Sequence, residues 1–76
     1  MQNVQDVADT ASSTALNSEI VRVVAQDANI TVEFGEAPTG AGDLIYMPQG
    51  DVEYFKITPG HLLRSVGGIA QVGECY

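Results

Sequence analysis

The chain contains very little of what most catalytic and metal sites require. Its 76 residues include one cysteine, Cys75, one histidine, His61, and no tryptophan. A lone cysteine cannot form an internal disulfide, and a structural zinc site takes about four Cys or His ligands. We therefore expect no metal and no other cofactor. A domain this short is marginally stable without such supports, so contacts with other chains are the expected source of extra stability.

Basic residues are also scarce. Arg22, Lys56 and Arg64 stand against ten acidic residues, which gives a formal net charge of −7. Binding to phosphates depends on clustered Lys and Arg side chains. We therefore expect no nucleic-acid partner and, for the same reason, no binding to an anionic membrane. An acidic surface instead suits a basic patch on another protein.

Long apolar runs are absent as well. No stretch approaches the roughly 18 apolar residues of a membrane span. Residues 1–6 have neither a basic segment nor an apolar segment after it, so we expect no signal peptide and synthesis in a cytoplasm. A lone thiol normally stays reduced in that compartment.

The texture of the sequence changes after residue 18. Residues 1–18 are rich in Gln, Asn, Asp, Ser and Thr, and their few apolar residues are mostly small. We expect an extended polar N-terminal arm here, with a short amphipathic helix or a frayed terminus as the alternatives. Residues 19–76 are expected to form the folded β-domain.

Short apolar runs separated by Gly and Pro predict an all-β domain, a small antiparallel β-sandwich or barrel. Ile30, Val32 and Phe34 alternate with polar residues, which is the period of a strand with one wet face. The six strands that we expect are residues 19–25, 29–34, 44–47, 52–58, 61–66 and 69–75.

The segments between these strands predict hairpins. Asp27-Ala28 leaves room only for a tight connection, and Gly67-Gly68 has the form of a two-residue hairpin loop. Pro59-Gly60 specifies a type II turn. Residues 35–42 hold three glycines and a proline, which is typical of a loop. Strands joined in this way favour an antiparallel meander.

No group of residues has the pattern of a catalytic centre. His61 follows a turn, and Cys75 is the penultimate residue, with no nucleophile–base arrangement around either. The carboxylates do not follow the spacing of a calcium loop, and the glycines of the 35–42 loop lack the GKS or GKT continuation of a phosphate-binding loop. We therefore expect that the protein is not an enzyme and has no catalytic, metal or cofactor-binding residues.

A family resemblance covers residues 19–75. It rests on the run Val32-Glu33-Phe34-Gly35-Glu36-Ala37-Pro38-Thr39, on Ile20-Val21-Arg22-Val23 before it, and on Glu53-Tyr54-Phe55-Lys56-Ile57 and Pro59-Gly60 after it. This pattern resembles small virion proteins of tailed bacteriophages, of the capsid decoration or cement type. The resemblance implies a β-sandwich that binds the outside of a capsid in many copies and holds neighbouring coat subunits together. Many relatives have a longer polar segment where this chain has only the loop 35–43.

The expected function is therefore that of a structural virion protein, located in the virion and assembled in the host cytoplasm. Its expected partners are the major capsid protein or other virion proteins, together with further copies of the chain in a homo-oligomer, either a dimer or a trimer. An exposed Tyr is a frequent interface anchor. The expected interface residues are Val4, Val7 and Leu16 in the arm, and Tyr54, Lys56 and Tyr76 in the β-domain.

Other functions stay open from the sequence. The alternatives are a head–tail, neck or tail-fibre structural module, and a β-module that binds a glycan or a receptor. A small acidic regulator that mimics DNA is a further possibility.

Overall fold

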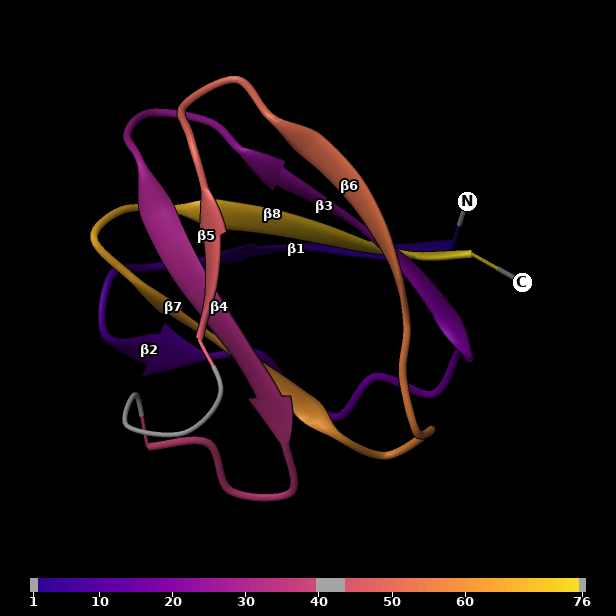
Figure 1. The fold of residues 1–76 in the computed structure, drawn as a ribbon. Helices are drawn as coiled ribbons and strands as arrows, with labels where there is room; N and C mark the ends of the chain where they lie inside the picture. The colour runs from indigo at the N-terminus through magenta and orange to yellow at the C-terminus, as the bar shows by residue number, and fades with distance from the viewer. Residues whose placement is uncertain (1, 40–43, 76) are drawn as a thin grey trace.

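Eight β-strands, with no helix among the described residues, make up the structure (Figure 1). This computed structural model describes residues 2–39 and 44–75. The strands are β1 (Gln2–Val7), β2 (Ala11–Ser12), β3 (Ile20–Ala25), β4 (Ile30–Gly35), β5 (Ile45–Met47), β6 (Val52–Lys56), β7 (Leu62–Val66) and β8 (Ala70–Cys75).

The strands form two antiparallel sheets of four strands each. The first sheet has the order β1-β8-β3-β6, and the second has the order β2-β7-β4-β5. The expectation of a small antiparallel all-β fold is confirmed, with eight strands in place of six.

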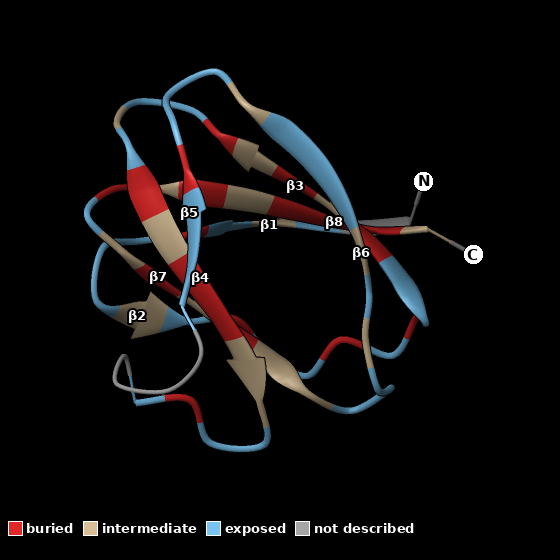
Figure 2. Ribbon diagram, viewed as in Figure 1, coloured by how far each residue is buried: buried red, intermediate tan, exposed pale blue. Residues whose placement is uncertain are grey.

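Small aliphatic side chains fill the space between the sheets. Val21, Val23 and Ala25 of β3 are fully buried, whereas Arg22 and Val24, which alternate with them, are only half-buried. Figure 2 shows the buried positions recurring along the central strands of both sheets. Each buried Val, Leu, Ile or Met side chain contributes about 1.5–3 kcal/mol on full burial. The buried core consists of Val7, Leu16, Val21, Val23, Ala25, Ile30, Val32, Met47, Leu63, Ala70 and Val72.

An aromatic contact joins the two sheets at the side of the sandwich where β4 and β6 approach. The ring centroids of Phe34 and Phe55 lie 5.2 Å apart, with the rings tilted by 54°. Tilted aromatic pairs at this separation contribute about 0.5–1.5 kcal/mol beyond the area that they bury. Both rings pack against the edge of the aliphatic core.

The N-terminal residues belong to the sandwich, which corrects the expectation of a polar arm over residues 1–18. β1 pairs with β8 in the first sheet, and β2 pairs with β7 in the second. Val7 and Leu16 are buried in the core. The segment has few apolar residues, but its strands pair with both sheets and two of its apolar side chains are buried. Residues 2–18 are therefore part of the same folded domain as residues 19–39 and 44–75.

The connections cross from one sheet to the other, which corrects the predicted hairpins and meander. β3 lies in the first sheet and β4 in the second, so the connection at Asp27-Ala28 is a crossing. The connection at Gly67-Gly68 also crosses, because β7 and β8 lie in different sheets. Among the described strands, only β4 and β5 are neighbours both along the chain and within a sheet. Crossing lets the apolar faces of successive strands pack against each other.

Polar side chains hold several of these crossings together at one end of the sandwich. Each provides a carbonyl or carboxylate oxygen to a backbone N–H of another connection, and Figure 1 shows these turns gathered toward the left and the top. Asp9 Oδ1 accepts from the backbone N–H of Gly67 at 2.8 Å, and Asp27 Oδ1 accepts from that of Ile69 at 3.0 Å. Asn29 Oδ1 accepts from the backbone N–H of Gln49 at 2.8 Å.

The turn at Pro59-Gly60 forms as the sequence predicts. Gly60 has a φ of 96°, the positive value that a type II turn requires at this position. The N–H of His61 donates to the carbonyl of Thr58 at 3.2 Å. The turn also fixes Leu16, whose carbonyl accepts from the N–H of Gly60 at 2.6 Å and whose own N–H donates to His61 at 2.9 Å.

Leu16→Ala tests whether the N-terminal segment is part of the core. We expect a loss of about 2–5 kcal/mol in the free energy of unfolding, because the substitution leaves a cavity at a fully buried site. Val4→Ala, at an exposed position of β1, serves as the control and is expected to cost less than about 1 kcal/mol. Urea denaturation measures both variants. Equal, small losses in the two would mean that the segment does not contribute to the core.

Candidate functional site

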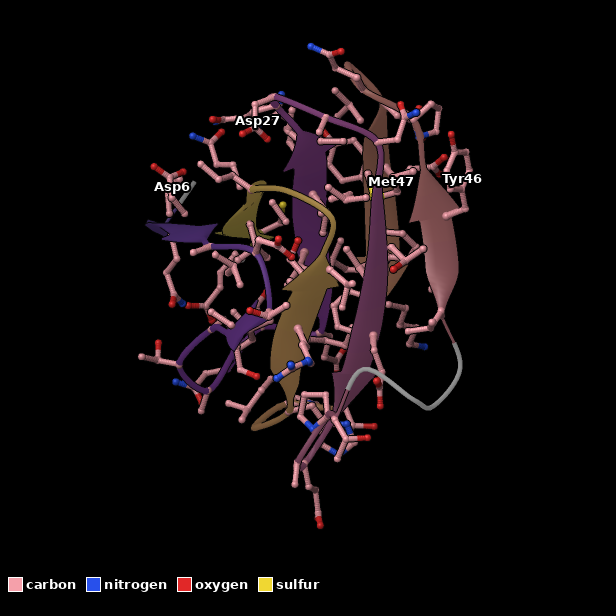
Figure 3. All side chains as sticks on the ribbon, turned by 90° about the vertical axis from the view of Figure 1, so that its left-hand side faces the viewer. Asp6, Asp27, Tyr46 and Met47 are labelled. Carbon is pink, nitrogen blue, oxygen red and sulfur yellow. The ribbon has the colours of Figure 1, made fainter. Side chains whose placement is uncertain are left out.

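The large apolar side chains exposed on the described surface gather in two places. Val4, Ile20, Val52 and Tyr54 lie on the first sheet. A smaller group consists of Leu44, Ile45 and Tyr46 at β5. Figure 3 shows Tyr46 directed away from the second sheet, whereas its neighbour Met47 points between the sheets. The first sheet therefore presents the larger candidate surface.

The outer face of the first sheet is the side turned away from the second sheet. The pairing registers arrange its residues in three rows that run across the strands. The middle row consists of Val4, Gly73, Arg22 and Tyr54. One flanking row consists of Asp6, Gln71, Val24 and Val52. The other consists of Cys75, Ile20 and Lys56.

The charge of the outer face is opposite to that of the whole chain. Arg22 and Lys56 are two of the three basic residues in the sequence. In the three rows described above, Asp6 is the only carboxylate, and it stands on β1 at one corner. The outer face is therefore apolar and slightly positive on a protein with a net charge of −7.

The expected interface residues lie partly on the surface and partly in the core. Val4, Tyr54 and Lys56 lie on the outer face, where Tyr54 is 63% exposed. Val7 and Leu16 are core residues, so the expectation that they bind a partner is corrected. Tyr76 lies outside the described residues.

The sequence prediction missed most residues of the outer face, among them the exposed Ile20 and Val52 and the basic Arg22. Ile20, Arg22 and Val52 stand beside Tyr54 and Lys56 in the rows of the first sheet. The alternation along residues 20–25 contained the signal, because Val21, Val23 and Ala25 share one face and leave Ile20 and Arg22 on the other. The pairing of residues 52–56 with that strand was not evident without the structure.

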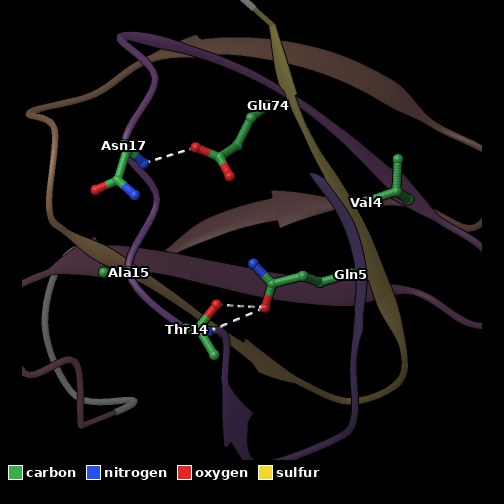
Figure 4. Close-up of a pocket in the computed structure, with 6 residues that line it drawn as sticks. All are labelled: Val4, Gln5, Thr14, Ala15, Asn17 and Glu74. Carbon is green, nitrogen blue, oxygen red and sulfur yellow. Dashed lines mark hydrogen bonds between the residues drawn. The ribbon is translucent and has the colours of Figure 1, made fainter. Parts of the chain in front are cut away.

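A recess lies beside β1 and β8, where the chain turns from β2 toward β3 (Figure 4). Its volume is about 460 Å³, and Val4, Gln5, Thr14, Ala15, Asn17 and Glu74 line it. Gln5 Oε1 accepts hydrogen bonds from the backbone N–H of Thr14 at 3.0 Å and from its hydroxyl at 3.1 Å. The side chain of Gln5 thus holds the segment after β2 against β1.

Glu74 is a buried carboxylate on β8 with a structural role in this recess. It is 2% exposed, and its Oε1 accepts the backbone N–H of Asn17 at 2.6 Å and of Ser18 at 3.1 Å. Hydrogen bonds to a charged acceptor are worth about 1.5–3 kcal/mol. Glu74 therefore fixes the bend that brings the chain from Leu16 into β3.

Two neighbouring carboxylates meet at the start of β6. A side-chain hydrogen bond with Asp51, followed by the negative charge of Asp51, raises the pKa of Glu53 above its ordinary value of 4.5. Burial adds little, since Glu53 is exposed on the edge strand. Such a pair destabilises the folded protein at neutral pH, where both groups are ionised.

His61 and Cys75 are not brought into a catalytic arrangement. His61 stands in the turn before β7, where its backbone holds Leu16. Cys75 is half-buried at the end of β8, and its carbonyl accepts a hydrogen bond from the hydroxyl of Ser18. Within residues 2–39 and 44–75, no three His, Cys, Asp or Glu side chains form a group that could hold a metal. The same residues include no helix able to cross a membrane.

Comparisons with known proteins give no match. No family model matches the sequence, and neither a curated protein nor a solved structure matches the chain. Function is therefore inferred from the surface and from the residues that lie on it.

The role of Glu74 can be tested by two substitutions. Glu74→Ala removes the acceptor of two backbone N–H groups and is expected to lower the free energy of unfolding by about 2–4 kcal/mol. Glu74→Gln keeps an oxygen acceptor and should lose roughly half as much. Urea denaturation measures both, with the exposed Glu36→Gln as the control. A Glu74→Ala variant as stable as the parent would show that the bend forms without this acceptor.

The carboxylate pair makes stability depend on pH in a defined direction. The pKa of Glu53 is higher in the folded protein than in the unfolded protein. As the pH falls, Glu53 therefore takes up its proton in the folded protein first. The free energy of unfolding therefore gains a contribution between neutral pH and the ordinary pKa of 4.5. In Asp51→Asn, the pKa of Glu53 should fall toward 4.5, as followed by NMR of its carboxyl carbon. An unchanged titration midpoint would contradict the role given to Asp51.

Proposed function

We propose that this chain is a non-enzymatic structural protein that binds another protein through the outer face of its first sheet. The observation that carries the proposal is the concentration of exposed apolar side chains there, from Val4 on β1 to Tyr54 on β6. Contiguous exposed apolar surface with interspersed polar residues is typical of protein-binding sites. Tyr and Arg, which are enriched at the centres of such sites, stand next to each other here as Tyr54 and Arg22.

The charge pattern favours a particular kind of partner surface. Arg22 is half-buried within the sheet and stands at the centre of the outer face, next to Tyr54. A partner with apolar side chains and a carboxylate opposite Arg22 would complement the outer face. The acidic remainder of the chain would repel acidic surfaces elsewhere and so favour one orientation.

We propose that the partner is the coat of a tailed bacteriophage and that the chain decorates its outside. Support comes from the resemblance of residues 19–75 to capsid decoration proteins, which the sequence carries in its strand and turn pattern. A small β-sandwich with one apolar face suits this role, because docking on a large shell covers surface that the isolated domain leaves exposed.

The copy number of this chain in purified particles tests the location. Hundreds of copies per particle are the expected result, since a decoration protein occupies repeated sites on the shell. About a dozen copies would support a neck or tail position instead. Absence of the chain from the particle would refute the structural role.

The outer face is tested by two matched isoleucine substitutions. Ile20 and Ile45 are each 39% exposed, but only Ile20 lies on the outer face. Ile20→Ala should weaken binding to coat shells lacking this protein by about tenfold, whereas Ile45→Ala should leave it unchanged. Sedimentation of the shells with bound protein measures the affinity. Equal effects of the two substitutions would rule out the outer face as the binding surface.

A further inference from the structure

β6 differs from the other edge strands in being long, regular and uncovered. β2 and β5 have only two and three residues. β1 carries an irregularity between Gln2 and Val4, and the segment after β2 is bonded to Gln5 beside it. β6 pairs with β3 without a break in register, and no strand of the described residues pairs with its other side. Such an edge is a template for pairing with another strand.

The backbone direction along β6 follows from the bonds at both ends of its ladder. The N–H of Ile57 donates to Glu19 at 2.7 Å, and the carbonyl of Asp51 accepts from Ala25 at 3.0 Å. Residues that bond to a neighbouring strand alternate with residues whose N–H and C=O point away from it. The backbone N–H and C=O groups of Glu53 and Phe55 therefore point toward β3. Val52, Tyr54 and Lys56 direct their backbone groups to the open edge.

We propose that β6 pairs antiparallel with β6 of a second copy of this chain, around a two-fold axis at Tyr54. In this register, Tyr54 lies opposite Tyr54 of the second copy, and Val52 lies opposite Lys56 of the second copy. Every one of these residues directs its backbone groups to the open edge, so each of the three pairs forms two hydrogen bonds. The two first sheets then become one sheet of eight strands.

The side chains fit this register and disfavour its neighbours. Lys56 faces Val52 of the second copy and Glu53 faces Phe55, so no like charges stand directly opposite. A shift by two residues in one direction places Glu53 opposite Glu53 of the second copy, and the opposite shift loses one of the three bonded pairs. A shift by one residue places residues whose backbone groups point to the open edge opposite residues whose backbone groups point to β3. The hydrogen bonds between the two copies then cannot form. The sequence of β6 is thus complementary to itself only when centred on Tyr54.

The pairing does not depend on the proposed function, since it concerns the isolated protein. It would, however, join two outer faces into a single continuous surface. A shell-binding face twice as wide would gain affinity by engaging two sites at once, as in other bivalent binders.

A single cysteine placed along β6 tests the register directly. In a Cys75→Ser background, Tyr54→Cys should form a disulfide-linked dimer on mild oxidation, because directly opposed Cα atoms lie about 5.5 Å apart in a bonded pair. Val52→Cys alone and Lys56→Cys alone should not crosslink, since neither faces itself. A mixture of the two should give the heterodimer. Equal crosslinking at all three positions, or none at 54, would overturn the proposal.

Charge substitutions at Val52 provide a second test without crosslinking. Val52→Lys places like charges opposite Lys56 of the second copy and should weaken the dimer about tenfold, as measured by sedimentation equilibrium. Val52→Glu places opposite charges there and should leave the dimer as tight or tighter. Net charge alone predicts the reverse order, since Val52→Glu makes an acidic chain more acidic. Gln71→Lys and Gln71→Glu, on β8 of the same face, serve as controls and should not show this order.

A strictly monomeric parent protein at millimolar concentration would refute the pairing. If the parent protein instead forms the dimer but does not bind coat shells, only the proposed function is refuted.

Discussion

The burial of aliphatic side chains between the two sheets is the interaction on which the rest of the structure depends. Val21 and Val23 from the first sheet meet Ile30 and Val32 from the second in a core that is closed to solvent. Nearly every described connection crosses between the sheets, so each successive strand adds an apolar face to the opposite side of the same core. The acceptors in the turns, such as Asp27, satisfy backbone groups that these abrupt crossings would otherwise leave without partners.

The N-terminal segment completes this core and closes its open end. Leu16 occupies the core, and the turn at Thr58–His61 bonds to its backbone on both sides. Glu74 then caps the bend that follows. A buried carboxylate is costly unless backbone donors face it, as they do here. The polar composition of residues 4–18 therefore reflects turns and outward positions of a folded segment.

The same arrangement leaves the outer face of the first sheet exposed. The outer face of the first sheet carries apolar residues and two cations on a chain with a net charge of −7, and its β6 edge has backbone groups directed to solvent. A face and an edge are different kinds of binding surface: side-chain complementarity governs the first and backbone register governs the second. A protein that occurs in many copies could use both at once, with the face against a scaffold and the edge against a neighbour.

The sequence by itself determined the all-β class, the positions of most strands and the Pro59-Gly60 turn, because these follow from local alternation and turn chemistry. It also determined that Tyr54 and Lys56 share a face. Only the tertiary structure decided which strands are neighbours. The four residues 26–29 fit a hairpin and a crossing equally well, and the choice depends on where the opposing apolar face lies. The fate of Leu16 was decided in the same way, since a single Leu in a polar segment becomes a core residue only where a cavity between two sheets accepts it.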